Sequence, residues 1–267
     1  MKPVRKKSWI LKQRPASVPN RDDVDIVEVD IPETLEGQVL IETSYFSLDP
    51  AIRGWMSDTP SYLPPIGLGD PIRASVTGTV VESKSPNLSV GDRVYGTGGW
   101  ETFCTGPAEY FSKIPDDSPF PDHYYLSIFG AVGLTPYFGL LSCGDIQSGQ
   151  TLLMSAAAGA VGSIGGQIAK IKGLRVVGLA GSEDKCNWVT DELGFDACIN
   201  YKTCGDLEAA IRSACPEGVD VFFDNVGGET LDAALLNLNK DATVVFCGSI
   251  STYNSSEPVP GPYNWWQ

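Results

Sequence analysis

A run of small residues from Ser155 to Gly162 is the feature that most constrains this chain. It lies between a short apolar run, 151–154, and a helical pattern that begins at residue 163. A strand, a turn of small residues and a helix start, in that order, form a cradle for a pyrophosphate. The backbone can approach the anion closely, and the helix start offers free amide groups and a partial positive charge. The residues expected to line this cradle are Ala158, Gly159, Ala160, Val161 and Gly162.

The match to the dinucleotide fingerprint G-x-G-x-x-G is incomplete, because Ala157 replaces its first glycine. An ordinary strand-to-helix turn is therefore the alternative interpretation. The surrounding pattern favours a nucleotide site, since apolar strands alternate with helical segments as in a doubly wound parallel sheet. Strands are expected at 150–154, 175–179, 197–200, 219–224 and 243–247, and helices at 162–172, 183–193, 206–215 and 230–237. A sixth strand is missing from this pattern, so we expect an incomplete Rossmann sheet over residues 129–267.

The first part of the chain, residues 1–128, has a different character. It is rich in glycine and proline and carries short alternating runs at 37–43, 74–82 and 91–96, with a hairpin turn expected at 90–94. These features predict an antiparallel, barrel-type β domain. The fold class is therefore α/β, with a β-barrel-type N-terminal domain ahead of the parallel sheet.

The end of the second expected strand indicates which nucleotide is bound. NAD-selective sheets place a carboxylate there, whereas this strand ends at Gly181 and Ser182, with Lys185 one turn further on. Gly181 leaves room, and Ser182 and Lys185 suit a 2′-phosphate, which favours NADP(H) over NAD. Tyr201, at the end of the third strand, is a candidate to close over the same phosphate. The alternative is that Ser182 caps the helix and Lys185 is a solvated helix residue.

Composition excludes several classes of partner. The net charge of −14 argues against nucleic acid and anionic membranes, and no apolar run is long enough to span a bilayer or form a signal peptide. The seven cysteines form no C-x-x-C pair, and the chain has one histidine, His123, so we expect no metal site. We expect a cytoplasmic protein with reduced thiols.

Several ordered motifs resemble those of the zinc-independent medium-chain dehydrogenase/reductases, specifically the prostaglandin reductase and alkenal double-bond reductase group. They are 47–56 (SLDPAIRGWM), 133–141 (GLTPYFGLL), 156–162 (AAAGAVG), 180–185 (AGSEDK), 194–197 with 200–202, 223–228 (FDNVGG) and 248–254 (GSISTYN). The resemblance implies a GroES-like N-terminal domain joined to a Rossmann domain. It also implies NADPH-dependent reduction of the carbon–carbon double bond of α,β-unsaturated aldehydes or ketones.

The resemblance also implies site residues. Ser182, Lys185 and Tyr201 are expected at the 2′-phosphate, and Gly159 to Val161 at the pyrophosphate. Asn225 and Ile250 are expected near the nicotinamide, and Cys247 and Tyr253 belong to the same expected cofactor-facing strand end.

Two departures from the family pattern bear on the chemistry. Many members carry a tyrosine, a proposed proton donor, where this chain has Ala51, and members continue beyond the point where this sequence ends. The expected donors are therefore Tyr253 first, then Tyr45, Tyr62, a water or a ribose hydroxyl. A truncated chain would expose strand 242–247 and weaken a homodimer. One alternative to a double-bond reductase is therefore an impaired, nucleotide-binding protein. A second alternative is a zinc-independent quinone reductase.

Overall fold

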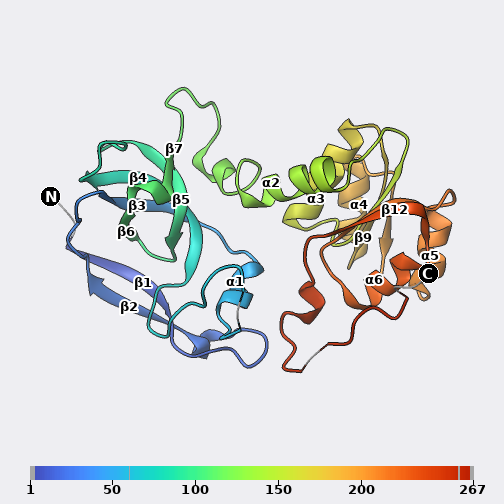
Figure 1. Ribbon diagram of the computed structural model, residues 1–267, viewed down its shortest axis with the longest axis horizontal. Helices are drawn as coiled ribbons and strands as arrows, with labels where there is room; N and C mark the ends of the chain where they lie inside the picture. The colour runs from blue at the N-terminus through green and yellow to red at the C-terminus, as the bar shows by residue number, and fades with distance from the viewer. Residues whose placement is uncertain (1–3, 60, 258, 265–267) are drawn as a thin grey trace. The chain divides into compact units, whose positions relative to one another are not determined.

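The computed structural model describes residues 4–59, 61–257 and 259–264, and it divides the chain into two compact units, 1–127 and 128–267. The sequence-based boundary lies one residue later, between 128 and 129. Figure 1 shows the two units, with antiparallel strands in the N-terminal unit and a helix-flanked sheet in the C-terminal unit.

The N-terminal unit is built from two antiparallel sheets. One pairs β1 (Arg5–Leu11) with β2 (Val24–Asp30); the other has the order β6-β3-β4-β5-β7. The strands of the second sheet are β3 (Gln38–Phe46), β4 (Arg73–Ser83), β5 (Arg93–Gly99), β6 (Phe103–Pro107) and β7 (Phe111–Lys113). Isolated bridges from Ser8 to Glu101 and from Ile10 to Pro71 tie β1 to the segments around the larger sheet.

Two central strands supply the core of this unit. Val39 and Ile41 on β3 and Val76 and Val80 on β4 are fully buried in one cluster, and their even spacing puts them on one face of the sheet. The hairpin turn expected at 90–94 is shorter than that, because Arg93 already begins β5. The turn runs from Ser89 to Asp92 and contains Gly91 at φ +94°.

Short helices complete the N-terminal unit. They are α1 (Ala51–Trp55) and the single-turn helices η1 (Arg21–Asp23), η2 (Ala108–Tyr110) and η3 (Asp122–Tyr125). Ile52 of α1 packs in a second cluster with Leu11, Ile66 and Ile72. This cluster fixes the segment that holds Ala51.

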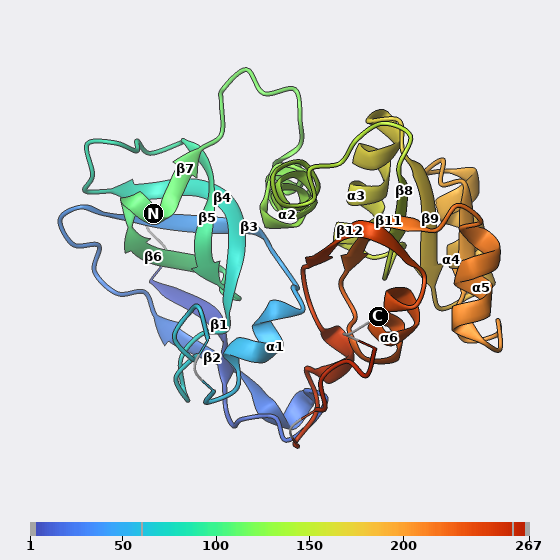
Figure 2. The same ribbon diagram turned by 45° about the vertical axis from the view of Figure 1, so that its right-hand side comes forward.

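The C-terminal unit contains a five-stranded parallel sheet of order β10-β9-β8-β11-β12. In chain order these are strands 3-2-1-4-5 of the unit, which is the doubly wound topology that was expected. The strands are β8 (Thr151–Met154), β9 (Arg175–Ala180), β10 (Ala197–Asn200), β11 (Val219–Asp224) and β12 (Leu238–Phe246). Figure 2 shows β12, β11, β8 and β9 side by side in this order.

Helices cover both faces of this sheet because its strands are apolar on both sides. Leu152 and Met154 face a core that includes Ala169 of α3, whereas Leu153 faces one with Ile211 of α5 and Leu231 of α6. The helices are α2 (Ala131–Phe138), η4 (Gly139–Cys143, a π-helical turn), α3 (Ala160–Ile171), α4 (Glu183–Asp191), α5 (Leu207–Ala214), α6 (Gly228–Leu235) and η5 (Ile250–Thr252). The α/β fold class is thereby confirmed.

The last strand begins earlier than expected, at 238 instead of 243, and α6 accordingly ends at Leu235 instead of Asn237. Asn239, Lys240 and Asp241 carry no apolar alternation, and β12 joins β11 with a register shift between Val219 and Val221. Asp241 has φ +65°, the left-handed conformation common at such irregularities. Within the described residues β12 has β11 as its one strand neighbour, and no described helix is long and apolar enough to cross a membrane.

Candidate functional site

The turn between β8 and α3 is held by main-chain hydrogen bonds. The amide of Ala157 donates to the carbonyl of Leu179 at 2.9 Å, and the amide of Gly159 donates to the carbonyl of Ala156 at 2.8 Å. Ala156 itself has φ +49°. Gly159 is the N-cap of α3 and supplies no capping side chain. The first hydrogen bond of the helix runs from the amide of Ser163 to the carbonyl of Gly159. The amide groups of residues 160–162 therefore have no acceptor within the helix and suit an anion.

Gly162 is required for the tightness of this turn. A Cβ on Gly162 would lie 2.3 Å from the carbonyl oxygen of Ala156 and 2.9 Å from Cα of Ala157. A Cβ on Gly159 would lie 3.0 Å from the same carbonyl oxygen. Because these neighbours are backbone atoms, any larger side chain would have to move the turn.

The structure also explains how alanine replaces the first glycine of the fingerprint. Ala157 is fully buried, and its Cβ lies 2.7 Å from the place where a Cβ on Gly178 would be. The methyl group of Ala157 therefore occupies space that Gly178 on β9 leaves open. A side chain on Gly178 would therefore collide with Ala157.

The end of β9 brings together the residues expected to recognise a 2′-phosphate. A Cβ on Gly181 would lie 2.9 Å from the hydroxyl of Tyr201 and 3.3 Å from Cε of Lys202. Ser182 is the N-cap of α4, and its hydroxyl accepts from the amide of Lys185 at 3.4 Å. The capping alternative is thus present in the structure, and the hydroxyl keeps its own proton to donate.

Lys202, which was not among the candidate residues predicted from the sequence, also lies beside Gly181. It follows Tyr201 directly at the end of β10, so the signal was a second polar residue at the end of the third strand. Adjacent residues on a strand point to opposite faces, so Tyr201 and Lys202 would do so if β10 continued. The chain turns immediately after Asn200, and this turn removes the alternation.

The carboxyl ends of β8, β11 and β12 are tied together. The side-chain amide of Asn225 donates to the carbonyl of Ser155 at 2.8 Å, and the main-chain amide of Asn225 donates to the Ser155 hydroxyl at 2.7 Å. The amide of Cys247 donates to the carbonyl of Asp224 at 2.8 Å, and that of Ile250 donates to the carbonyl of Asn225 at 3.2 Å. Asn225, Cys247 and Ile250 therefore lie at one edge of the sheet.

Tyr253 lies at the same edge, just after η5. Its hydroxyl oxygen accepts from the amide of Ser249 at 3.3 Å and lies 2.9 Å from the place where a Cβ on Gly248 would be. Because the oxygen accepts a hydrogen bond, the hydroxyl proton is free to be donated elsewhere. Of the three candidate tyrosines, this one belongs to the unit that contains the turn after β8.

The other two tyrosines belong to the N-terminal unit. Tyr45 is 51% exposed and contacts the ring of His123 edge to face, with centroids 5.7 Å apart. Tyr62 is 76% exposed and contacts Trp55, with centroids 6.1 Å apart. Each tyrosine thus lies in its own aromatic pair.

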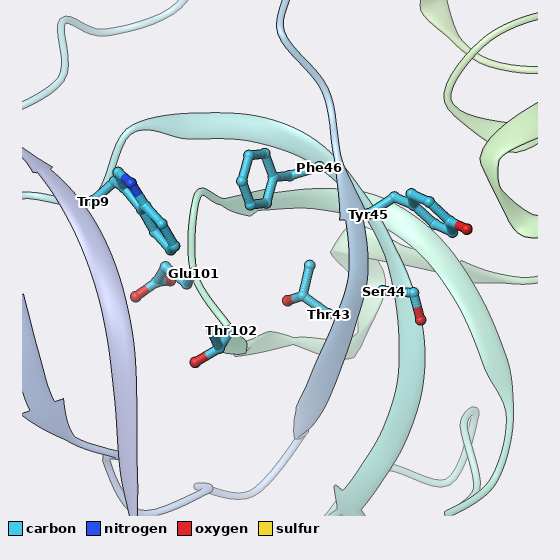
Figure 3. A pocket seen from close by; sticks show the side chains of 7 residues that line it. All are labelled: Trp9, Thr43, Ser44, Tyr45, Phe46, Glu101 and Thr102. Carbon is cyan, nitrogen blue, oxygen red and sulfur yellow. The ribbon is translucent and has the colours of Figure 1, made fainter. Parts of the chain in front are cut away.

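A small cavity of about 280 Å³ adjoins Tyr45 in the N-terminal unit (Figure 3). Trp9 and Phe46 lie side by side in it, with ring centroids 5.9 Å apart, and the ring of Tyr45 points away from them. Glu101 also lines the cavity and forms an ion pair with Lys6, with both side chains nearly buried. Tyr45 is thus a rim residue. In the described part of the chain, no three His, Cys, Asp or Glu side chains form a group that could hold a metal ion.

Comparison with known proteins assigns the family. Residues 7–114 match the family model described as the N-terminal domain of oxidoreductase, and residues 160–263 match the model described as zinc-binding dehydrogenase. The putative NADP-dependent oxidoreductase YfmJ of Bacillus subtilis is 46% identical over 92% of this chain and 72% of its own length. This chain belongs to the zinc-independent medium-chain dehydrogenase/reductases, among their NADP-dependent oxidoreductases.

Further members of this medium-chain dehydrogenase/reductase family support the assignment. The NADPH-dependent curcumin reductase of Escherichia coli is 41% identical over 97% of this chain and 74% of its own length. Prostaglandin reductase 1 of Bos taurus is 40% identical over 97% of this chain and 77% of its own length. The crystal structure of CurA from Vibrio vulnificus in complex with NADPH has a TM-score of 0.91 and 37% identity, covering 97% of this chain and 76% of that one. The family and the NADP(H) cofactor expected from the sequence are confirmed.

Proposed function

We propose that this chain uses NADPH to reduce the carbon–carbon double bond of α,β-unsaturated aldehydes or ketones. The observation that carries the proposal is the end of β9, where Gly181 has no side chain and the hydroxyl of Tyr201 packs closely against it. No carboxylate ends this strand; Ser182 caps the next helix, and the first turn of that helix contains Glu183, Asp184 and Lys185. Such a strand end accepts a 2′-phosphate and lacks the acidic residue that would select NAD.

The residues of the C-terminal unit fit the cofactor by their shape and donors. The amide groups of residues 160–162 are suited to the pyrophosphate, and Gly159 and Gly162 let it approach the backbone. Asn225, Cys247 and Ile250, joined at the sheet edge, are proposed to contact the nicotinamide half. When bound, NADPH supplies the hydride for the β-carbon of the substrate.

The protein must also stabilise the negative charge that gathers on the carbonyl oxygen and deliver a proton to the α-carbon. We assign the first role to the hydroxyl of Tyr253, which is held by Ser249 and keeps a free proton. A fixed donor aimed at a developing oxyanion lowers the barrier because it needs no reorganisation. Tyr45 and Tyr62, in the N-terminal unit, are the next candidates for either role, since Ala51 occupies the position of the family tyrosine.

The names of the relatives support a reductase acting on small organic molecules. One relative is a curcumin reductase and another a prostaglandin reductase, and the first is described as NADPH-dependent. Substrate choice among unsaturated aldehydes and ketones depends on pocket shape, which differs from member to member.

The test is a fluorescence titration of the 267-residue chain with NADPH and, in parallel, NADH, followed by turnover of a 2-alkenal and of a small quinone. We expect binding that prefers NADPH and turnover that prefers the alkenal. Preference for NADH, or no binding of either nucleotide, would contradict the cofactor assignment. NADPH binding with quinone as the better substrate would contradict the proposed reaction alone.

A further inference from the structure

The side chain of Lys202 lies over Gly181, beside the hydroxyl of Tyr201. Its Cε lies 3.3 Å from the place where a Cβ on Gly181 would be, and the Tyr201 hydroxyl lies 2.9 Å from the same point. Both side chains therefore pack closely against the bare backbone of Gly181 at the end of β9. Lys202 is exposed, and within the described residues its ammonium pairs with no carboxylate.

Hydrogen bonds in the turn after β10 fix the main-chain position of Lys202. The amide of Lys202 donates to the side-chain oxygen of Asn200 at 3.2 Å, and the amide of Tyr201 donates to the carbonyl of Ala180 at 3.1 Å. The amides of Thr203 and Cys204 both donate to the carbonyl of Asn200. Tyr201 is thus attached to the end of β9 through its main-chain amide, and Lys202 is attached to the end of β10 through Asn200.

Asn200 also restrains an acidic side chain in the first turn of α4. Its Nδ2 donates to a carboxylate oxygen of Glu183 at 2.7 Å, and the hydroxyl of Thr203 donates to the same oxygen at 3.3 Å. Glu183 lies in the first turn of α4, where an unrestrained carboxylate would repel a phosphate at Gly181. Its charge is instead held toward Asn200 and Thr203, while the ammonium of Lys202 stays available.

We propose that Lys202 is a specificity-determining residue for the 2′-phosphate, acting with Lys185 as a second cation, and that Asn200 positions it. This inference rests on the proposed function. Two cations at one phosphate add charge-assisted contacts that a nucleotide without the 2′-phosphate cannot make. Lys202 thus discriminates between nucleotides and leaves the adenosine and pyrophosphate contacts unchanged.

The test compares two fragments that differ in the 2′-phosphate, 2′,5′-ADP and 5′-AMP. Their dissociation constants are measured by calorimetry with the full chain, for the wild type, Lys202→Met, Lys202→Arg and the control Lys172→Met. Lys172 is an exposed lysine at the C-terminal end of α3, about 18 Å along the helix from the cradle, at 1.5 Å per residue. A thermal melt of each variant confirms that it is folded.

We expect Lys202→Met to weaken binding of 2′,5′-ADP about tenfold, the size of one charge-assisted contact, and to leave 5′-AMP within about twofold. Lys202→Arg should keep most of the preference for 2′,5′-ADP over 5′-AMP, and Lys172→Met should keep all of it. Equal effects of Lys202→Met on both fragments, or no effect, would overturn the inference while the wild-type preference stands. A wild type that binds both fragments equally would contradict the proposed NADPH specificity itself, and the inference with it.

Discussion

The hydroxyl of Ser155 donates to the carboxylate of Asp224 at 3.0 Å, although 69 positions separate the two residues in the chain. Both side chains are fully buried. The same carboxylate accepts from the amides of Val226 and Gly227, and the Ser155 hydroxyl accepts from the amide of Asn225. One buried charge thereby joins the ends of β8 and β11 and shapes the loop that contains Asn225.

Asp224→Asn tests this arrangement. The Asp224 carboxylate only accepts hydrogen bonds, from the Ser155 hydroxyl and from two main-chain amides. The side-chain NH2 of an asparagine would face at least one of these donors and could not accept from it. We expect the free energy of unfolding, measured by urea denaturation, to fall by about 2–3 kcal/mol, the cost of leaving buried polar groups unpaired. Asp191→Asn, on the exposed side of α4, should change it by less than about 0.5 kcal/mol. Equal stability of the two variants would show that the buried network contributes little.

Gly162→Ala tests the tightness of the nucleotide cradle. The added methyl group would lie 2.3 Å from the carbonyl oxygen of Ala156, so the turn must shift. We expect at least a tenfold loss of NADPH affinity by fluorescence titration and a loss of stability of about 1–3 kcal/mol. The matched control is Gly54→Ala in α1, where a Cβ meets nothing within 4 Å. Unchanged NADPH affinity in Gly162→Ala would argue against this turn as the nucleotide site.

Tyr253→Phe removes one hydroxyl and the hydrogen bond that it accepts from the amide of Ser249. If that hydroxyl stabilises the oxyanion, kcat for a 2-alkenal should fall about 100-fold, as when one such donor is removed, with the dissociation constant of NADPH unchanged. Tyr263→Phe is the control, because Tyr263 is 65% exposed. Full activity of Tyr253→Phe would move the role to Tyr45 or Tyr62, each tested by its own phenylalanine variant.

Asp196 predicts a pH-dependent contribution to stability. Partial burial opposes ionisation, but the ammonium of Lys170 at 2.8 Å and the amide of Val176 at 2.7 Å outweigh it and hold the pKa of Asp196 below its usual value. A lowered pKa stabilises the folded state above the unfolded pKa of about 4, and this contribution is lost as pH falls through the lower, folded value.

Asp196→Asn should therefore cost about 1 kcal/mol at pH 7, and this cost should shrink as pH falls below about 4. Urea denaturation at a series of pH values measures it. Asp116→Asn is a suitable control, since Asp116 also pairs with a lysine but is 81% exposed. A cost for Asp196→Asn that stays constant from pH 7 to pH 3 would disprove the linkage.

The parallel sheet could be predicted because its strands are short apolar runs with turn residues between them. β10 and β11 were predicted with the bounds that the structure has. The start of β12 could not be predicted, because Asn239 to Asp241 join the sheet through an irregular pairing and carry no apolar pattern. Local patterning indicates where a strand is buried, and only pairing with a neighbour determines where it begins.

The candidate site was predictable where a residue type has a direct chemical reason. Ser182 and Tyr201 were found at strand ends by that reasoning. The fit of Ala157 against Gly178 was not, because it depends on two residues on adjacent strands whose relation appears only in the folded sheet. Lys202 was not among the predicted residues, because its position depends on a turn held by Asn200.

The glycine before α3 makes the stability of the C-terminal unit depend on its ligand. No side chain accepts hydrogen bonds from the first amides of α3, so a bound anion would be their acceptor. A nucleotide at 100 times its dissociation constant adds about 2.7 kcal/mol to the free energy of unfolding. The fraction of chains that unfold and become open to proteases would then depend on the concentration of the nucleotide. That concentration would affect the abundance of this protein as well as its rate of turnover.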